Sequence, residues 1–256
     1  VAASNPDLTV WVITGDGDGL SIGGNHIIHA LRRNMNLKIL LFNNQIYGLT
    51  KGQYSPTSEI GKRTKTSPMG SIDWPFNPVS LALGAEATFV ARTIDMDRKH
   101  TTEILAAAYE HRGASFIEIY QNCNVFNDKA FIELTGKGLR DENRIYLEHG
   151  KPILFGPDLE RGVVMGPEGA QVVNVADVGL DRIQIHNAED PEPGVAFALS
   201  RLSVGPHGPT PLGVFLDVDR PTYESLMADQ LVEAQARKGP GDLAATIRSS
   251  GTWTVD

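Results

Sequence analysis

Two short apolar segments joined by a helix-length stretch constrain the fold of this chain more than any other feature. Residues 10–14 (VWVIT) and 38–43 (KILLFN) have the length and apolar content of buried strands. A turn rich in glycine and acid lies between them at 15–19, and helical spacing of apolar residues then predicts a helix over about 20–34, with Ile22 and His26 on its inward face. Two strands connected through a helix form a βαβ unit, so we expect parallel neighbours in one sheet.

Further elements of the same kind extend this sheet. The sequence predicts helices over 78–83 and 101–112 and strands over 89–91 and 116–120, with residues 92–98 as a polar connection carrying surface charge pairs. The fold class is therefore α/β, a doubly wound parallel sheet. After residue 127 the short apolar runs at 153–155, 172–175, 183–185 and 214–216 are broken by Gly and Pro, which favours edge strands or a small added layer. We expect residues 1–127 to form the ligand-binding domain and residues 128–256 an irregular C-terminal extension that packs on a partner subunit.

The turn and the second strand carry residues that suit a metal ion and a phosphate group. Gly15-Asp16-Gly17 is followed by twenty-five residues and then by Asn43-Asn44. The glycines allow close approach of a ligand, and N–H groups at a helix N-terminus stabilise phosphate. The Asp16 carboxylate, the Asn44 amide oxygen and the Ile46 carbonyl would supply three oxygens to Mg²⁺, with diphosphate oxygens and water completing the octahedron. Taken alone, a glycine-acid turn is a weak signal for phosphate binding, and the alternative reading is a tight strand-to-helix turn.

The GDG-x25-NN spacing resembles the thiamine diphosphate fingerprint, and the strings that follow narrow the family. NNQIYGLTKGQ, SPTS, TKTSPMGS and QNCNVFND resemble the β subunits of 2-oxoacid:ferredoxin oxidoreductases, most closely the 2-oxoglutarate synthase branch. The resemblance has specific motifs over about residues 9–128. It implies a sheet of the thiamine diphosphate-binding type and a reversible oxidative decarboxylation of a 2-oxoacid to acyl-CoA (2-oxoglutarate to succinyl-CoA). Electrons would pass through a [4Fe–4S] cluster to ferredoxin.

The resemblance also assigns roles to residues of the long polar loop at 47–78, which it places over the cofactor. Lys51 would meet the second carboxylate of the oxoacid, helped by Leu49 and Thr50; a solvated surface lysine is the alternative reading of Lys51. Mg²⁺ would be held by Asp16, Asn44 and Ile46. The expected cofactor-binding residues are Gly15, Asp16, Gly17, Asp18, Gly19, Asn44, Ile46, Gly48 and Leu49.

Cys123 is the single cysteine of the chain. A lone cysteine is commonly a small core residue. In the family, the cysteine of the NC-x-VFN motif is one of four thiolates on a [4Fe–4S] cluster, and the others lie upstream. Because the chain starts at Val1 and lacks the upstream Cys-Pro-Gly-Cys pair of the family, we expect it to be N-terminally incomplete.

Charge and composition exclude several classes of partner. The net charge of −8 argues against nucleic acid and anionic membranes, and no apolar run approaches the ~18 residues of a membrane span. We expect a cytoplasmic protein whose partners are the α subunit, ferredoxin, coenzyme A and a 2-oxoacid. Lys62, Arg63 and Lys65 form either a solvated loop or a positive patch for ferredoxin or coenzyme A phosphates.

Two alternative functions remain open on the sequence. A non-oxidative thiamine enzyme, such as a decarboxylase or an acetohydroxyacid synthase, shares the GDG and asparagine pattern but lacks the YGLTKGQ loop and the later cysteine. A non-catalytic cofactor-binding subunit is the other alternative. The intact Asp16 and Asn44 argue against it, because a retired site has no reason to keep metal ligands.

Overall fold

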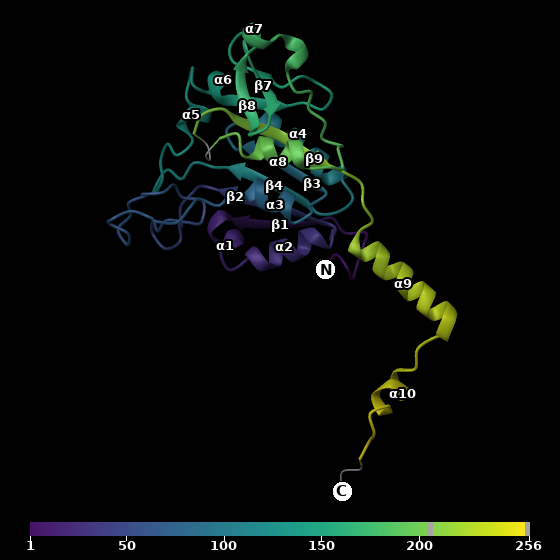
Figure 1. The fold of residues 1–256 in the computed structure, drawn as a ribbon. Coiled ribbons are helices and arrows are strands. Elements are labelled where there is room, and N and C mark those ends of the chain that lie inside the picture. Colours follow the sequence, from purple (N-terminus) through teal and green to yellow (C-terminus); the bar gives the residue numbers. More distant parts are fainter. Residues whose placement is uncertain (204–206, 254–256) are drawn as a thin grey trace.

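The computed structural model describes residues 1–203 and 207–253, and within them a six-stranded sheet of order β1-β2-β4-β3-β9-β5 forms the centre (Figure 1). Strands β1, β2, β4 and β3 are parallel, as the βαβ pattern predicts. Strand β9 runs antiparallel to β3, and β5 is parallel to β9. The strands are β1 (Val10–Gly15), β2 (Leu37–Asn43), β3 (Phe89–Ile94), β4 (Ser115–Tyr120), β5 (Arg144–Leu147) and β9 (Thr210–Asp217).

Helices cover both faces of this sheet, so the predicted doubly wound arrangement is confirmed. On one face α2 (Gly24–Arg32), α3 (Pro78–Gly84) and α8 (Gly194–Ser200) bury residues such as Leu31, Val79 and Leu199 in a shared apolar core. On the other face α4 (Arg98–Glu110) buries Ile104 and Ala108 against a second core. Burial of these side chains provides the main stabilisation of the layers.

The second half of the chain adds a small layer and an arm. An antiparallel sheet of order β6-β7-β8 lies beside the main sheet, and α9 and α10 project away from the body (Figure 1). Among the described residues, no helix is both long and apolar enough to cross a membrane. These elements are α5 (Ile132–Thr135), α6 (Arg140–Asn143), β6 (Leu154–Phe155), β7 (Arg161–Gly166), β8 (Gly169–Asn174), α7 (Val175–Val178), the 3₁₀ helix η1 (Leu180–Arg182), α9 (Tyr223–Lys238) and α10 (Leu243–Arg248).

The predicted helix over 20–34 is two helices in the structure. α1 (Asp16–Leu20) starts in the turn itself, and the helix is interrupted at residues 21–23 before α2 begins. The break contains Gly23, where a β-carbon would lie 2.7 Å from the backbone oxygen of Asp18. Ile22 sits in this break and is 86% exposed, and His26 is exposed as well, so the prediction that they face inward is wrong.

Two other local predictions are corrected. The sequence predicts a buried strand at 10–14, but in the described sheet β1 is an edge strand that pairs with β2, and Ile13 is 70% exposed. α4 begins three residues before the predicted Thr101, because the Asp97 side chain accepts a hydrogen bond from the His100 N–H at 3.2 Å and caps the helix there. The Thr101 hydroxyl instead donates to the Ile94 carbonyl at 3.1 Å.

The apolar runs of the second half differ in their roles. The run at 214–216 belongs to β9, which lies inside the main sheet between β3 and β5 rather than at an edge. The run at 183–185 forms no strand and contributes only an isolated bridge between Pro152 and Ile185. The main sheet therefore takes strands from both sides of residue 127, and the division of the chain at that point stays a prediction.

Candidate active site

The carboxyl ends of β1 and β2 bring the glycine-acid turn against the paired asparagines. Asp16 is the first residue of α1 and is only 1% exposed. Its Oδ1 accepts a hydrogen bond from the backbone N–H of Asn44 at 3.4 Å. Ligands of parallel sheets bind beyond this edge, so the two predicted metal ligands lie where a cofactor is expected.

The Asn44 side chain has a fixed orientation in this arrangement. Its Oδ1 accepts a hydrogen bond from the Ile46 N–H at 3.2 Å, which only the oxygen of the amide can do. The loop bearing Ile46 is thus held against Asn44. The three residues predicted to bind Mg²⁺ lie within one short segment and its neighbouring turn.

Two hydroxyl groups that the sequence interpretation did not assign to the site hold the Asp16 carboxylate. Ser55 Oγ and Thr57 Oγ1 donate to Asp16 Oδ2 at 2.5 and 2.7 Å. Burial raises the pKa of the Asp16 carboxyl above its usual value, and these two hydrogen bonds oppose the rise. In the sequence, the motif SPTS indicates only the family, because hydroxyl residues in a loop have no periodicity that indicates a contact.

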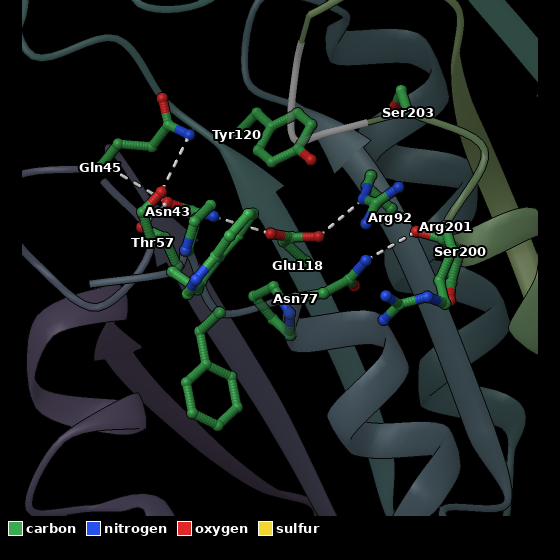
Figure 2. A pocket seen from close by; sticks show the side chains of 14 residues that line it. Asn43, Gln45, Thr57, Asn77, Arg92, Glu118, Tyr120, Ser200, Arg201 and Ser203 are labelled. Carbon is green, nitrogen blue, oxygen red and sulfur yellow. Dashed lines mark hydrogen bonds and ion pairs between the residues drawn. The ribbon is translucent and has the colours of Figure 1, made fainter. Parts of the chain in front are cut away.

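A buried chain of polar side chains continues from this carboxylate across the sheet (Figure 2). Thr57 Oγ1 lies 2.9 Å from Asn43 Oδ1, and Asn43 Nδ2 donates to Glu118 Oε1 at 2.8 Å. The second oxygen of Glu118 accepts from Arg92 Nε at 2.6 Å. The chain therefore crosses β2, β4 and β3 in the order in which they pair.

The sequence interpretation of Arg92 is wrong. It was expected on a surface connection, whereas it lies in β3, is 3% exposed and pairs with a fully buried glutamate. The strand was predicted to end at Ala91, but it continues to Ile94. The sequence does contain a signal for this, because Arg92 directly follows the apolar run at 89–91 and could continue the strand. An arginine buried in a strand requires a buried acid as its partner.

Two cavities adjoin these residues. One, of about 200 Å³, lies along the polar chain and is lined by Asn43, Glu118 and Arg92 (Figure 2). The other, of about 600 Å³, is formed mainly by the long loop and is lined by Tyr47, Ser55 and Trp74 among others. Trp74 lines both cavities.

The loop after Ile46 is a short hairpin whose tip extends into solvent. Tyr47 and Gln53 pair at its base, where the Tyr47 N–H donates to the Gln53 carbonyl at 2.8 Å. The predicted substrate residues Leu49, Thr50 and Lys51 form the exposed tip, and Leu49 is 98% exposed. They line neither of the two cavities described above, so their role stays a prediction.

The remaining turn residues have distinct environments. A β-carbon on Gly17 would lie 2.3 Å from the Tyr47 ring, and one on Gly19 would lie 2.7 Å from the Leu41 side chain. Gly19 thus allows α1 to pack closely on the sheet. Gly15 ends β1, Asp18 is exposed, and Gly48 has open space around its α-carbon.

Cys123 lies in a loop that is hydrogen-bonded to the Asn44 segment. Its carbonyl accepts from the Asn127 N–H at 3.0 Å, and Asn127 Nδ2 donates to the Asn44 carbonyl at 2.9 Å. Lys62 Nζ donates to Asn127 Oδ1 at 2.6 Å and forms an ion pair with Glu59, so this lysine is part of the same packing rather than a free patch. In the described part of the chain, no group of three or more His, Cys, Asp or Glu residues is placed to hold a metal ion.

Comparison with known families gives the class of this domain. Residues 1–119 match the family described as thiamine pyrophosphate enzyme, C-terminal TPP binding domain. The fold, the turn with its buried aspartate and this match define a thiamine diphosphate-binding domain of the doubly wound α/β type.

Individual relatives narrow the class. The chain is 55% identical over 258 residues to the 2-oxoglutarate oxidoreductase subunit KorB of Mycobacterium tuberculosis, an alignment that covers 100% of this chain and 69% of that protein. It is 44% identical over 128 residues to the 2-oxoacid:ferredoxin oxidoreductase subunit beta of Saccharolobus solfataricus, covering 50% and 42%. The solved 2-oxoglutarate:ferredoxin oxidoreductase of Magnetococcus marinus superimposes with a TM-score of 0.70 at 29% identity, covering 98% of this chain and 70% of that one. The chain belongs to the β subunits of the 2-oxoacid:ferredoxin oxidoreductases, of the 2-oxoglutarate type.

Proposed function

We propose that this chain binds thiamine diphosphate through Mg²⁺ and, together with an α subunit, converts 2-oxoglutarate and coenzyme A to succinyl-CoA and CO₂ and passes the two electrons released to an external acceptor. The observation that carries the proposal is the buried Asp16 carboxylate beside Asn44 at the carboxyl ends of β1 and β2. The KorB relative is named as a 2-oxoglutarate oxidoreductase, and the Magnetococcus structure holds 2-oxoglutarate, coenzyme A and succinyl-CoA. Ferredoxin as the electron acceptor follows from the family resemblance, and a cytoplasmic location follows from the composition; both stay predictions.

The residues present fit a divalent cation. Asp16 is buried, and no charged side chain in the described part of the chain contributes to its pKa shift. A buried carboxylate without a counter-charge is costly, and a bound cation removes that cost. Because the oxygen donors are one carboxylate, one amide and one backbone carbonyl, the site suits an ion that also takes phosphate oxygens, as Mg²⁺ does.

Thiamine diphosphate, when bound, would supply the carbanion chemistry of the decarboxylation. The protein would bind and orient the cofactor. Asp16, Asn44 and the Ile46 carbonyl would hold the metal, and the Gly15–Gly19 turn would accommodate the diphosphate. We further propose that Lys51 binds the distal carboxylate of the substrate, and that Cys123 is one ligand of a [4Fe–4S] cluster whose other ligands lie outside this sequence. The hydrogen bond from Asn127 to the Asn44 carbonyl supports placing that cluster near the cofactor.

Cofactor retention by the Asp16→Ala variant tests the metal site directly. The α–β complex is dialysed against Mg²⁺-containing buffer, and the thiamine diphosphate and magnesium that stay bound are measured. We expect wild type and the exposed control Asp7→Ala to retain both, and Asp16→Ala to lose both. Undiminished retention by Asp16→Ala would overturn the proposed function.

Activity of the same complex separates the alternatives. We expect 2-oxoglutarate to reduce a viologen dye only when coenzyme A is present. Release of CO₂ without dye reduction would favour a non-oxidative thiamine enzyme. Bound thiamine diphosphate without any turnover would favour a non-catalytic subunit.

A further inference from the structure

The two oxygens of the Asp16 carboxylate are in different environments. Oδ2 lies within 2.5 and 2.7 Å of the hydroxyls of Ser55 and Thr57. Oδ1 accepts the longer hydrogen bond from the Asn44 N–H at 3.4 Å. Oδ2 thus has two strong donors, whereas Oδ1 retains lone-pair capacity for another partner.

The hydroxyl proton of Ser55 has one acceptor available at short distance. The neighbouring Ser58 hydroxyl donates its own proton to the Gln45 carbonyl at 2.6 Å and accepts the Ser55 N–H at 2.8 Å. The contact between the two serine hydroxyls is longer, at 3.3 Å. Ser55 therefore donates to Asp16.

The proton of Thr57 is directed by the buried chain behind it. Glu118 is held by Arg92 and needs a donor from Asn43, so the amide nitrogen of Asn43 faces Glu118 and its oxygen faces Thr57. That oxygen already accepts the Gln45 N–H at 3.1 Å. A hydroxyl donates more strongly to a carboxylate than to a neutral amide oxygen, so the Thr57 proton goes to Asp16.

We propose that Ser55 and Thr57 are positioning residues that select the metal ion, an inference that rests on the proposed function. By occupying Oδ2 they leave Oδ1 as the ligating oxygen and prevent Asp16 from binding a cation with both oxygens. Ca²⁺ accepts bidentate carboxylates and a variable ligand number, whereas Mg²⁺ requires near-ideal octahedral geometry and one oxygen per carboxylate. The hydroxyl pair thereby favours Mg²⁺ over Ca²⁺.

Metal-dependent cofactor binding tests this selection without using turnover. The metal-free α–β complex is titrated with Mg²⁺ or with Ca²⁺ at a fixed thiamine diphosphate concentration, and bound thiamine diphosphate is measured by equilibrium dialysis. For Thr57→Val and Ser55→Ala we expect the half-saturating Mg²⁺ concentration to rise about tenfold, which is typical when a group holding a metal ligand is removed. The half-saturating Ca²⁺ concentration should rise by much less, so the preference for Mg²⁺ falls.

Two further variants complete the design. Thr57→Ser keeps the hydroxyl and should restore the wild-type metal preference. Thr102→Val makes the same change at an exposed position of α4, where the hydroxyl donates to the Arg98 carbonyl at 2.8 Å, and should leave both titrations unchanged. Ser55→Ala removes a single oxygen and keeps the test possible even if Thr57→Val does not fold.

The outcomes separate the inference from the proposed function. Equal weakening of Mg²⁺ and Ca²⁺ in both variants would mean that the hydroxyls support only the structure, and would overturn the inference. Wild-type titration curves for both variants would overturn it as well. If the wild-type complex fails to bind thiamine diphosphate in the presence of either metal, the proposed function is overturned, and this inference with it.

Discussion

The Tyr47 hydroxyl donates a hydrogen bond to the Gly17 carbonyl oxygen at 3.0 Å, and the tyrosine ring occupies the space where a side chain at position 17 would begin. This contact joins the turn after β1 to the loop after β2. The backbone of Gly17 does not have a positive φ, so glycine is required here by the close approach of Tyr47 rather than by an unusual conformation. The shape of the proposed diphosphate site depends on that approach.

Gly17→Ala is therefore expected to displace Tyr47 and weaken cofactor binding. The added β-carbon would lie 2.3 Å from Tyr47 Cε1, and overpacking of this kind costs about 1–3 kcal/mol. We expect a comparable loss in the free energy of unfolding, measured by urea denaturation, and at least tenfold weaker retention of thiamine diphosphate. Gly24→Ala is the matched control, since a β-carbon there meets nothing within 4 Å. Equal behaviour of the two variants would show that the Tyr47 contact does not constrain position 17.

The buried pair of Arg92 and Glu118 gives a second prediction. Arg92→Met leaves the fully buried Glu118 without its counter-charge, and breaking a buried pair in this way costs about 3–5 kcal/mol. The double variant Arg92→Met, Glu118→Leu removes both charges, so it should recover part of that loss. Urea denaturation measures the free energy of unfolding of the single and the double variant. Lys99→Met, which breaks an exposed pair with Glu103 at 3.9 Å, should change stability by less than about 1 kcal/mol. A double variant less stable than Arg92→Met would contradict this account.

Lys38 gives a prediction about pH. It is buried at the start of β2, and its Nζ donates to the backbone carbonyls of His111 and Gly113. Burial lowers the pKa of Lys38 to about 8, despite the opposing effect of Asp217. In the unfolded chain a lysine titrates near ~10.4. Between these values the unfolded state binds more protons than the folded state, so this group makes stability rise with pH.

The measurement compares wild type with Lys38→Met by urea denaturation from pH 7 to pH 10. The difference in unfolding free energy should shift in favour of wild type by about 2–3 kcal/mol between pH 8 and pH 10, at 1.36 kcal/mol per pKa unit. Lys99→Met, at an exposed site, should show no such trend. A difference that stays flat or falls over this range would contradict the assignment.

Hydrophobic periodicity and the polarity of the strands are sufficient to predict part of this structure from the sequence. The βαβ unit follows from two apolar runs and the spacing between them, and the meeting of Asp16 with Asn44 follows because carboxyl ends of parallel neighbours share one edge. The place of β9 inside the sheet could not be predicted in this way, because an antiparallel strand joined through a long irregular segment leaves no local pattern.

The polar chain behind the site was not predictable for a related reason. Arg92 and Glu118 are twenty-six residues apart and meet only because β3 pairs with β4. Ser55 and Thr57 lie in a polar loop, where a hydroxyl that binds a carboxylate looks the same in sequence as one that faces water. Such contacts depend on tertiary packing, which a local pattern does not encode.

Lys51 offers a test of substrate choice. It lies at the exposed tip of the Tyr47–Gln53 hairpin with a φ of 67°, a conformation that strains a residue with a side chain. Hydrogen bonds to charged groups contribute about 1.5–3 kcal/mol, so Lys51→Ala should lower kcat/KM of the α–β complex for 2-oxoglutarate by roughly 10- to 150-fold. The value for pyruvate, which has no second carboxylate, should hardly change.

Two companion variants separate the charge of Lys51 from its backbone conformation. Lys51→Gly relieves the strain at positive φ but also removes the ammonium group, so it should lose 2-oxoglutarate turnover as Lys51→Ala does. Lys51→Arg keeps a cation and should retain most of the preference for 2-oxoglutarate over pyruvate. Because both substrates share the keto acid group, an effect confined to 2-oxoglutarate locates the interaction at its distal carboxylate. Equal loss for both substrates in Lys51→Ala, recovered in Lys51→Gly, would instead assign the residue a role in the shape of the loop.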